Sequence, residues 1–429
     1  MSKQSLTRTV TTSMIGNLFE FYDFALFGYF APIIGKLFFP SDNPTVELIS
    51  AFGVFAAGFV VRPLGGLVFG HIGDLFGRKR ALVLAILLMA IPTAIIGMLP
   101  TYQHIGVTAS ILLVAMRMLQ GLSLGGNYSG SITFVTEHTD PNKRGLMGGF
   151  AVASCLAGIL LGSATAAFFA KILNESELHT FGWRLPFLMG VLICFVGIYM
   201  RRKVDESPEF LKERADASAA KADHPLREIG KKYKKQLACA VGATMLHDLS
   251  FYLIFVYMTT YLTSILGIPE DVALTINTVN LVIVAVVTVI AAWLSDKWGR
   301  KKILTASALL FIVGTIPLMT LVNTKSTENI LTAQMILAIA VGGYFGPIPA
   351  LMIEAFPTRV RFSASALTTN ISGPLFGGTA PMLVTWLIDK TGSNMVPAFY
   401  LTGAAVTALI AVRCIKNVNK KSHKMQTKA

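Results

Sequence analysis

Six ionisable side chains lie inside long apolar stretches of the sequence, where ionised groups are rare. They are Glu20, Asp23, Arg62, Arg117, His247 and Asp248. A carboxylate can take up and release a proton, and a guanidinium can hold a carboxylate through two parallel hydrogen bonds. A charge near the centre of a bilayer costs at least about 2.5–3.5 kcal/mol, so these groups require partners, a wet cavity or both. Their types indicate proton exchange and recognition of a charged ligand.

Four residues are predicted to couple a proton: Glu20, Asp23, Arg117 and Asp248. Glu20 and Asp23 stand three residues apart and share a helix face. With His247 neutral, the three acids and two arginines sum to −1, which one bound proton would neutralise. Glu20 or Asp23 is the favoured carrier, because burial and a nearby arginine act on a carboxyl in opposite directions. The competing interpretation is a set of fixed ion pairs, and for His247 and Asp248 the two interpretations carry equal weight.

A second set of side chains is predicted to contact a small substrate. It comprises Asn17, Tyr22, Arg62, Arg117, Gln120, Asn127, Tyr128, His247 and Tyr252. Aromatic faces suit a quaternary ammonium group, and an arginine suits a carboxylate. With 28 Phe and 11 Tyr in the chain, the alternative for any one aromatic residue is packing or lipid contact.

The elements that position these residues are apolar helices. The chain has 429 residues, of which 53% are apolar and only 14% charged, whereas a soluble domain carries about 25% charged residues. Twelve stretches meet or approach the roughly 20 residues needed to span a bilayer, and in lipid such stretches form helices because the backbone must satisfy its own hydrogen bonds. They cover residues 9–35, 48–73, 81–100, 105–136, 145–170, 185–200, 236–265, 272–295, 303–324, 329–353, 362–388 and 391–412.

The positive charges predict the orientation of these helices. With the N-terminus in the cytoplasm, 30 of the 37 Lys and Arg residues fall in cytoplasmic loops and tails, as the positive-inside rule requires. The net charge of +14 is then explained by the orientation of the helices in the membrane and does not indicate nucleic-acid binding. We expect both termini in the cytoplasm, six helices in residues 1–200, a charged linker in 201–235, six more helices in 236–415 and a basic tail in 416–429. No cleavable signal peptide and no C-terminal coiled coil are expected.

Two loop motifs repeat between the halves. Asp74 with its Gly-Arg pair returns 222 positions later at Asp296, and Glu137 returns 217 positions later at Glu354. Such duplication is typical of transporters that bind substrate at the repeat interface. The loops are predicted to form a cytoplasmic gate from Gly70, Asp74, Gly77, Arg78, Glu137, Arg144, Asp296, Gly299, Arg300, Glu354 and Arg361. The alternative is that their basic residues only anchor the topology.

These motifs resemble those of the major facilitator superfamily over nearly the whole chain. The loops at Asp74 and Asp296 are similar to its signature loop, and the run from Arg117 to Gly126 is similar to its fourth-helix motif. Within the superfamily the chain resembles the metabolite:proton symporters, which include proline/betaine, citrate, 2-oxoglutarate and shikimate carriers. Matching residues also stand in helix one, in helix two and around helix six: Gly16, Asn17, Glu20, Tyr22, Asp23, Arg62, Pro63, Gly65, Gly66, Gly182, Trp183, Arg184, Pro186, Phe187, Glu206, Ser207, Pro208 and Phe210. Asn127 departs from the pattern, because a Glu commonly follows the paired glycines.

The resemblance implies an all-α polytopic membrane protein of twelve helices in two six-helix bundles. The expected function is proton-coupled import of a small carboxylate-bearing metabolite by alternating access, proline or betaine first and di- or tricarboxylates second. A non-transporting membrane sensor on the same fold is the alternative of another class. The expected partners are a small solute, H⁺ and the bilayer of the cell or inner membrane, with no nucleic acid, and a monomer is expected to suffice. No enzymatic activity, cofactor or metal is expected.

Overall fold

A computed structural model describes residues 3–42, 44–188, 191–192, 195, 199, 203, 205–215 and 225–416. All regular elements in this part of the chain are helices. Ten of them are long and apolar enough to cross a membrane, or eleven if the bent pair at the N-terminus counts as one span. The predicted helical spans are confirmed for eleven of the twelve segments, and most of the segment 185–200 lies outside the described residues.

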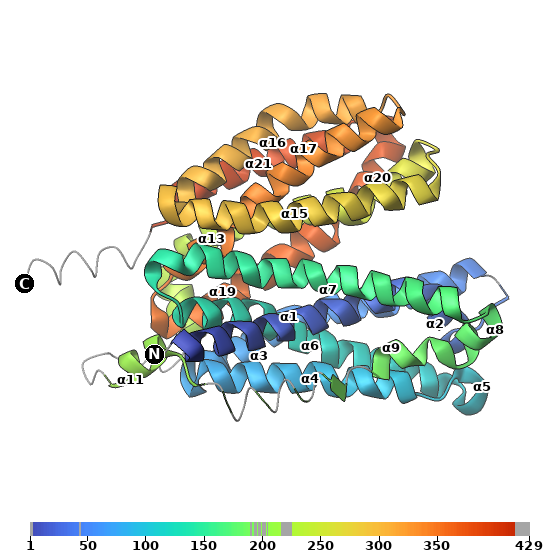
Figure 1. Ribbon diagram of the computed structural model, residues 1–429, viewed down its shortest axis with the longest axis horizontal. Coiled ribbons are helices and arrows are strands. Elements are labelled where there is room, and N and C mark those ends of the chain that lie inside the picture. The colour runs from blue at the N-terminus through green and yellow to red at the C-terminus, as the bar shows by residue number, and fades with distance from the viewer. Residues whose placement is uncertain are drawn as a thin grey trace, which may run out of the picture. The chain divides into compact units, whose positions relative to one another are not determined.

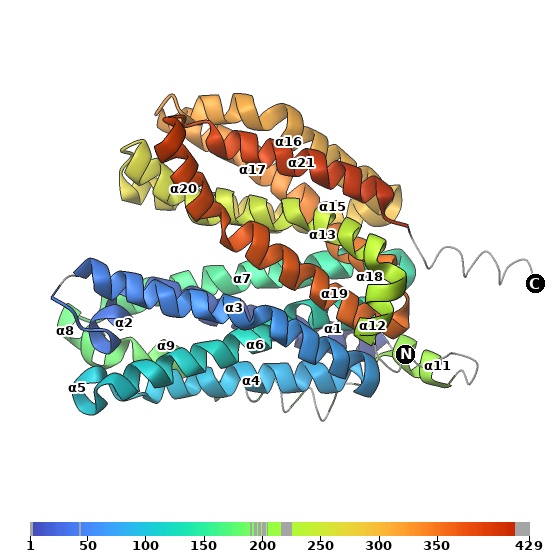
Figure 2. The ribbon, with the colours of Figure 1, turned by 180° about the vertical axis from the view of Figure 1, so that it is seen from behind.

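The chain divides into two compact units. The first comprises Met1–His138 and Ser154–Lys221, and the second Thr139–Ala153 and Ala222–Ala429. The boundary passes through one long helix, so its first turns belong with the second unit. Figures 1 and 2 show the elements of each unit from two sides.

The first unit is built around four long helices, and α3 packs along α6, which also packs along α4. A 65° bend separates α1 from α2, where Pro32 enters the first turn of α2, a position that proline tolerates. The elements of this unit, with the helix that crosses the boundary, are α1 (Lys3–Tyr29), α2 (Ala31–Phe38), α3 (Pro44–Phe76), α4 (Arg78–Met98), α5 (Tyr102–Ile105), α6 (Val107–Glu137), α7 (Arg144–Ile172), α8 (Glu175–Glu177), η2 (Leu178–Gly182), α9 (Arg184–Leu188) and α11 (Pro208–Ala215).

The second unit places α16 between α17 and α21, and α15 packs along α17. Two of its spans contain wide π-type turns, at η4 and η6. Its elements are η1 (Pro141–Lys143), α12 (Pro225–Glu228), η3 (Ile229–Tyr233), α13 (Lys234–Phe251), η4 (Tyr252–Tyr257), α14 (Met258–Thr260), η5 (Tyr261–Ile265), α15 (Glu270–Trp298), α16 (Arg300–Val322), α17 (Thr327–Phe345), α18 (Ile348–Ala355), α19 (Thr358–Ser372), η6 (Gly373–Gly378), α20 (Ala380–Thr391) and α21 (Val396–Cys414).

Candidate functional site

An ion pair between α1 and α6 forms the centre of the polar cluster in the first unit. Arg117 Nη1 donates to Asp23 Oδ2 at 3.1 Å, and the two side chains are 5% and 0% exposed. The same nitrogen donates to Gln120 Oε1 at 2.8 Å, and the guanidinium lies 4.1 Å from the centroid of the Phe27 ring. The structure thus brings Asp23 and Arg117, two of the residues predicted to couple a proton, together inside the unit.

The amide of Gln120 extends this pair to a third helix. Gln120 Nε2 donates to Thr93 Oγ1 at 2.7 Å, and Thr93, on α4, is fully buried. Thr93 was not predicted, although it follows Pro92 as a polar residue in an otherwise apolar helix. The four side chains form a chain of hydrogen bonds across α1, α6 and α4.

A small internal space adjoins the Asp23–Arg117 pair. It has a volume of about 20 Å³ and is bordered by Phe59 of α3 as well as by the pair itself. Most of its lining is apolar, and its polar groups come from Asp23, Arg117 and Gln120. Asp23 Oδ1 is buried and has no hydrogen-bond partner in the described structure, so a water in this space would satisfy it.

Glu20 sits one turn before Asp23 with a neutral partner. Its Oε2 accepts a hydrogen bond from Asn127 Nδ2 of α6 at 2.7 Å, and Glu20 is 1% exposed. Its other oxygen, Oε1, is buried without a partner among the described residues. Asn127 therefore places a neutral amide of α6 against Glu20. Asn17 is buried on α1, the helix that carries Glu20.

Arg62 lies on α3 and is only partly buried. Its guanidinium carbon is 5.3 Å from the centroid of the Phe59 ring, and that ring meets the edge of Phe24 at 5.4 Å. Arg62 Nε is buried without a hydrogen bond, and the described residues include no acid that forms an ion pair with it. Glu20 is nonetheless near enough to interact with Arg62 electrostatically.

Glycines set how closely α3 and α6 approach. A Cβ at Gly121 would collide with the Gly58 carbonyl, and a Cβ at Gly125 would collide with the Arg62 carbonyl. Small residues permit such close helix contacts in membranes. The crossing therefore holds the backbone of Arg62 against the helix that carries Arg117 and Asn127.

The two predicted tyrosines of the first unit differ in position. Tyr22 is 1% exposed and belongs to a hydrophobic cluster with Phe27 and Trp183, and its hydroxyl donates to the Pro186 carbonyl at 3.3 Å. Tyr128 is half-buried and meets the edge of Phe21 at 6.1 Å. Tyr22 thus has a packing role in the structure, and contact of either tyrosine with substrate stays a prediction.

The second unit carries its own polar pair on α13. His247 Nδ1 and Asp248 Oδ1 are 3.0 Å apart, and the His247 ring stacks on Phe345 with centroids 4.0 Å apart. Asp248 Oδ2 has no hydrogen-bond partner within the described structure. Gly377 of η6 leaves room for the Tyr252 ring, which a Cβ there would strike. Three of the predicted residues thus gather at one place in this unit.

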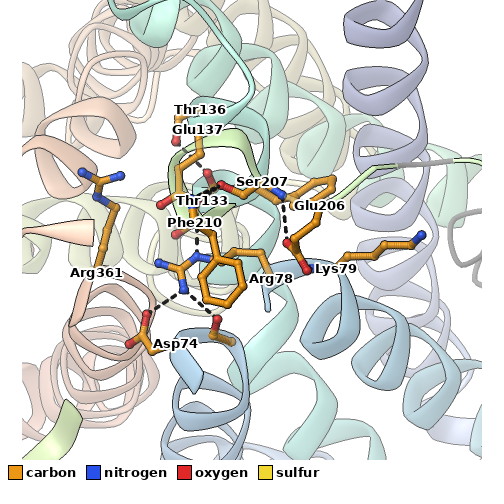
Figure 3. Close-up of polar contacts among 12 residues, drawn as sticks. Asp74, Arg78, Lys79, Thr133, Thr136, Glu137, Glu206, Ser207, Phe210 and Arg361 are labelled. Carbon is orange, nitrogen blue, oxygen red and sulfur yellow. Dashed lines mark hydrogen bonds and ion pairs between the residues drawn. The ribbon is translucent and has the colours of Figure 1, made fainter. Parts of the chain in front are cut away.

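The repeated loop motif of the first unit is a buried network centred on Arg78 (Figure 3). Arg78 pairs with Asp74 at 3.1 Å and with Glu137 at 3.2 Å, and all three side chains are fully buried. Ser207 donates a short hydrogen bond to the same Glu137 carboxylate, and the Phe210 ring lies 4.9 Å from the Arg78 guanidinium. The segment that begins at Ser207 therefore completes the network.

The corresponding motif of the second unit repeats this geometry. Arg300 pairs closely with Asp296 and, at 3.3 Å, with Glu354. Asp296 also accepts hydrogen bonds from the backbone N–H groups of Gly145 at 2.9 Å and Leu146 at 2.8 Å, at the N-terminus of α7. A carboxylate is stabilised there by the helix dipole and the free N–H groups.

A glycine with a positive φ breaks the helix before each of these arginines. Gly77 has φ of +111° and Gly299 has φ of +99°, a region that L-residues with a Cβ avoid. Behind Gly77, the Glu206 carboxylate accepts a hydrogen bond from the Lys79 N–H at 3.1 Å and so caps α4. The sequence repeat thus corresponds to a repeated backbone turn and a repeated Asp-Arg-Glu network.

The remaining predicted gate residues are buried. Gly70 lies in α3, Arg144 begins α7 with 6% exposure, and Arg361 is 1% exposed. Arg361 Nε donates to the Phe356 carbonyl at 3.3 Å. Their burial fits a structural or gating contact better than a role as exposed topology anchors.

Comparison with known proteins identifies the family of this chain. The family profile of the Major Facilitator Superfamily matches residues 13–369 and 240–428. The proline/betaine transporter of Escherichia coli (strain K12) is 34% identical over 433 residues, which cover 99% of this chain and 86% of that protein. The glycine betaine/proline/ectoine/pipecolic acid transporter of Dickeya dadantii (strain 3937) is 32% identical over 431 residues, with the same coverage.

Solved structures share the fold at low sequence identity. The proton:xylose symporter XylE bound to 6-bromo-6-deoxy-D-glucose matches with a TM-score of 0.80 and 20% identity, covering 97% of each chain. The transporter FucP in the outward conformation matches with a TM-score of 0.71 and 15% identity, covering 95% of this chain and 98% of that chain. The helical spans, the duplicated network and these matches together show that the chain is an integral membrane protein that belongs to the Major Facilitator Superfamily.

Proposed function

We propose that the chain is a secondary transporter that imports a small carboxylate-bearing solute together with a proton, with proline and betaine as the first candidates. The observation that carries the proposal is the buried cluster of Glu20, Asp23, Arg62 and Arg117. Buried ionisable residues in membrane helices mark proton relays and substrate pathways. The names of the relatives, identical to this chain at 32–34% of positions, support proline and betaine as substrates.

Within this proposal the two carboxylates have different tasks. Asp23 is held by Arg117 in an ion pair, whereas the hydrogen-bond partner of Glu20 in the described structure is the neutral amide of Asn127. Glu20 can therefore gain or lose a proton without breaking an ion pair, so we assign the coupling proton to Glu20. Asp23 and Arg117 position the helices around it, and Asp248 with His247 supplies a second polar group in the other unit.

The duplicated Asp-Arg-Glu networks serve as the cytoplasmic gate. Asp296 holds the first turn of α7 through two backbone N–H groups. Alternating access requires such contacts to break and reform in each cycle. The proposal includes a functional monomer, cytoplasmic termini, and the division into residues 1–200, 201–235, 236–415 and 416–429.

The test is uptake into proteoliposomes under an imposed inward proton gradient. Proline, betaine, citrate, 2-oxoglutarate and succinate are offered in parallel, each with and without a protonophore, and a sodium gradient serves as the control for the coupling ion. We expect protonophore-sensitive accumulation of proline or betaine. Accumulation of only the di- or tricarboxylates would identify these as the substrate class instead of proline and betaine. Accumulation of none of the five would favour a non-transporting membrane sensor.

A further inference from the structure

Arg62 differs from Arg117 in how its charge is compensated. Arg117 is paired with Asp23 and bonded to Gln120, whereas no acid among the described residues pairs with Arg62. Its Nε is buried and without a partner there. A half-buried guanidinium in a membrane helix is costly when no acid is paired with it. A bound ligand with a carboxylate would compensate the charge of Arg62.

The surroundings of Arg62 fit a small ligand that carries both a carboxylate and an apolar cation. The guanidinium carbon lies over the face of the Phe59 ring, 5.3 Å from its centroid, and Phe24 packs against Phe59 edge to face. A carboxylate binds along the edge of a guanidinium with two hydrogen bonds, and aromatic faces attract quaternary ammonium groups. The close α3–α6 crossing at Gly125 fixes the backbone of Arg62.

The charges of the cluster link this site to a proton. With both carboxyls ionised, Glu20, Asp23, Arg62 and Arg117 sum to zero. One added proton leaves Arg62 without the ionised Glu20 carboxylate, and the carboxylate of a solute can take its place. A zwitterion such as betaine adds no net charge, so this compensation is local to the guanidinium. A guanidinium that lacks a nearby carboxylate is costly inside the membrane, so protonation of Glu20 favours a solute carboxylate at Arg62.

Among the described residues near Glu20, Arg62 is the charged group that no acid holds in an ion pair. The titratable and charged groups that face Glu20 are Asp23 on its own helix, Arg62 on α3 and the Cys155 thiol on α7. Asp23 is already paired with Arg117, and the thiol of Cys155 is buried. The Arg62 carbonyl lies against Gly125 of α6, two residues before the Asn127 that holds the Glu20 carboxylate. An ionised Glu20 therefore attracts the Arg62 guanidinium, and a protonated Glu20 releases it.

We propose, on the basis of the function proposed above, that Arg62 binds the carboxylate of the substrate and that ionised Glu20 competes with the substrate for this guanidinium. Proton binding at Glu20 then favours substrate binding at Arg62, and substrate binding favours the proton by the same factor. The two residues form a specificity and coupling site that needs no movement of the Asp23–Arg117 pair.

The first experiment measures binding of glycine betaine and choline to the purified protein by isothermal titration calorimetry. Choline has the same trimethylammonium group but a hydroxyl in place of the carboxylate. We expect the wild-type protein to prefer betaine by at least about 10-fold, and Arg62→Gln to lose about 10- to 100-fold in betaine affinity, which corresponds to the loss of charge-assisted hydrogen bonds. Arg80→Gln, which removes an exposed arginine, is the matched control and should bind as the wild type does.

Two results would overturn the assignment of Arg62. One is betaine affinity in Arg62→Gln equal to that of the wild type. The other, which needs no variant, is wild-type protein that binds betaine and choline equally well. Arg62→Lys keeps the positive charge and is the control for misfolding caused by loss of that charge. It should retain more betaine affinity than Arg62→Gln.

The second experiment tests the competition by Glu20. The wild-type affinity for betaine should fall as the pH rises from about 6 to about 8, and Glu20→Gln should bind betaine tightly with no pH dependence. A wild-type pH profile in Glu20→Gln would refute the competition. Succinate and citrate serve as further carboxylate probes. If the protein binds only these two, proline and betaine are excluded as substrates, and the role of Arg62 is then tested by the loss of succinate or citrate affinity in Arg62→Gln. A protein that binds none of these carboxylates overturns both proposals, and proton-driven uptake that survives Arg62→Gln overturns this one alone.

Discussion

Removing the acid from the Asp23–Arg117 pair should destabilise the protein strongly. Asp23→Asn leaves the Arg117 guanidinium charged, 5% exposed and without its carboxylate. Breaking a buried ion pair from one side costs about 3–5 kcal/mol because a buried charge loses its compensation. Gln120 and the Phe27 ring still contact the guanidinium, so we expect the lower end, about 3 kcal/mol.

The loss is measured as the free energy of unfolding in mixed micelles titrated with a denaturing detergent. Asp389→Asn removes an exposed acid of α20 and is the matched control, with an expected change below about 0.5 kcal/mol. The double variant Asp23→Leu/Arg117→Met removes both charges and should recover most of the stability, because apolar residues of similar volume replace a buried pair at little cost. It should not recover proton-driven uptake.

Two outcomes would refute this reasoning. A loss below about 1 kcal/mol in Asp23→Asn would mean that the pair behaves like a solvated surface pair. Additive losses in the double variant would mean that the two side chains do not act on each other. Full uptake in the stable double variant would remove the pair from the transport mechanism.

Three further predictions concern helix packing, the gate and pH. Gly121→Val should abolish folding or surface expression, because its side chain would overlap the Gly58 carbonyl at the α3–α6 crossing, whereas Gly403→Ala, which meets open space, should express normally. Asp296→Asn should speed amide hydrogen exchange at the first turn of α7 by about 10- to 100-fold, because the N–H groups lose a charged acceptor. Unchanged exchange would contradict the contact between Asp296 and α7. Glu328→Gln, which changes an exposed acid, is the control. Burial lowers the pKa of His138 from 6.5, against the opposing effects of the Phe134 carbonyl and Glu137. His138 therefore stays neutral in the folded protein at a pH where it takes up a proton in the unfolded chain. Stability should therefore fall as the pH drops below about 6.5, and His138→Gln should flatten that acid limb in unfolding titrations; an equal acid loss in the variant would exclude His138 as its cause.

The sequence by itself predicted the helices, their repeat and the membrane setting. Apolar stretches of about 20 residues can satisfy their backbone hydrogen bonds in lipid only as helices, so composition and length suffice to predict them. The same scarcity of charge made Glu20, Asp23, Arg62 and Arg117 recognisable. Helix periodicity relates only near neighbours, however, and it could not show which of these side chains meet.

The tertiary structure decided the partners. It pairs Arg117 with Asp23 and Asn127 with Glu20, and it leaves Arg62 against an aromatic ring. It also brings Ser207, 70 positions away, onto the Glu137 carboxylate of the Arg78 network. These contacts depend on which helices cross and how closely, and the crossing of α3 and α6 is set by glycines that carry no charge. Because charge pairing acts over a few ångströms, only the packed helices determine which acid is held by an arginine and which is bonded to a neutral amide.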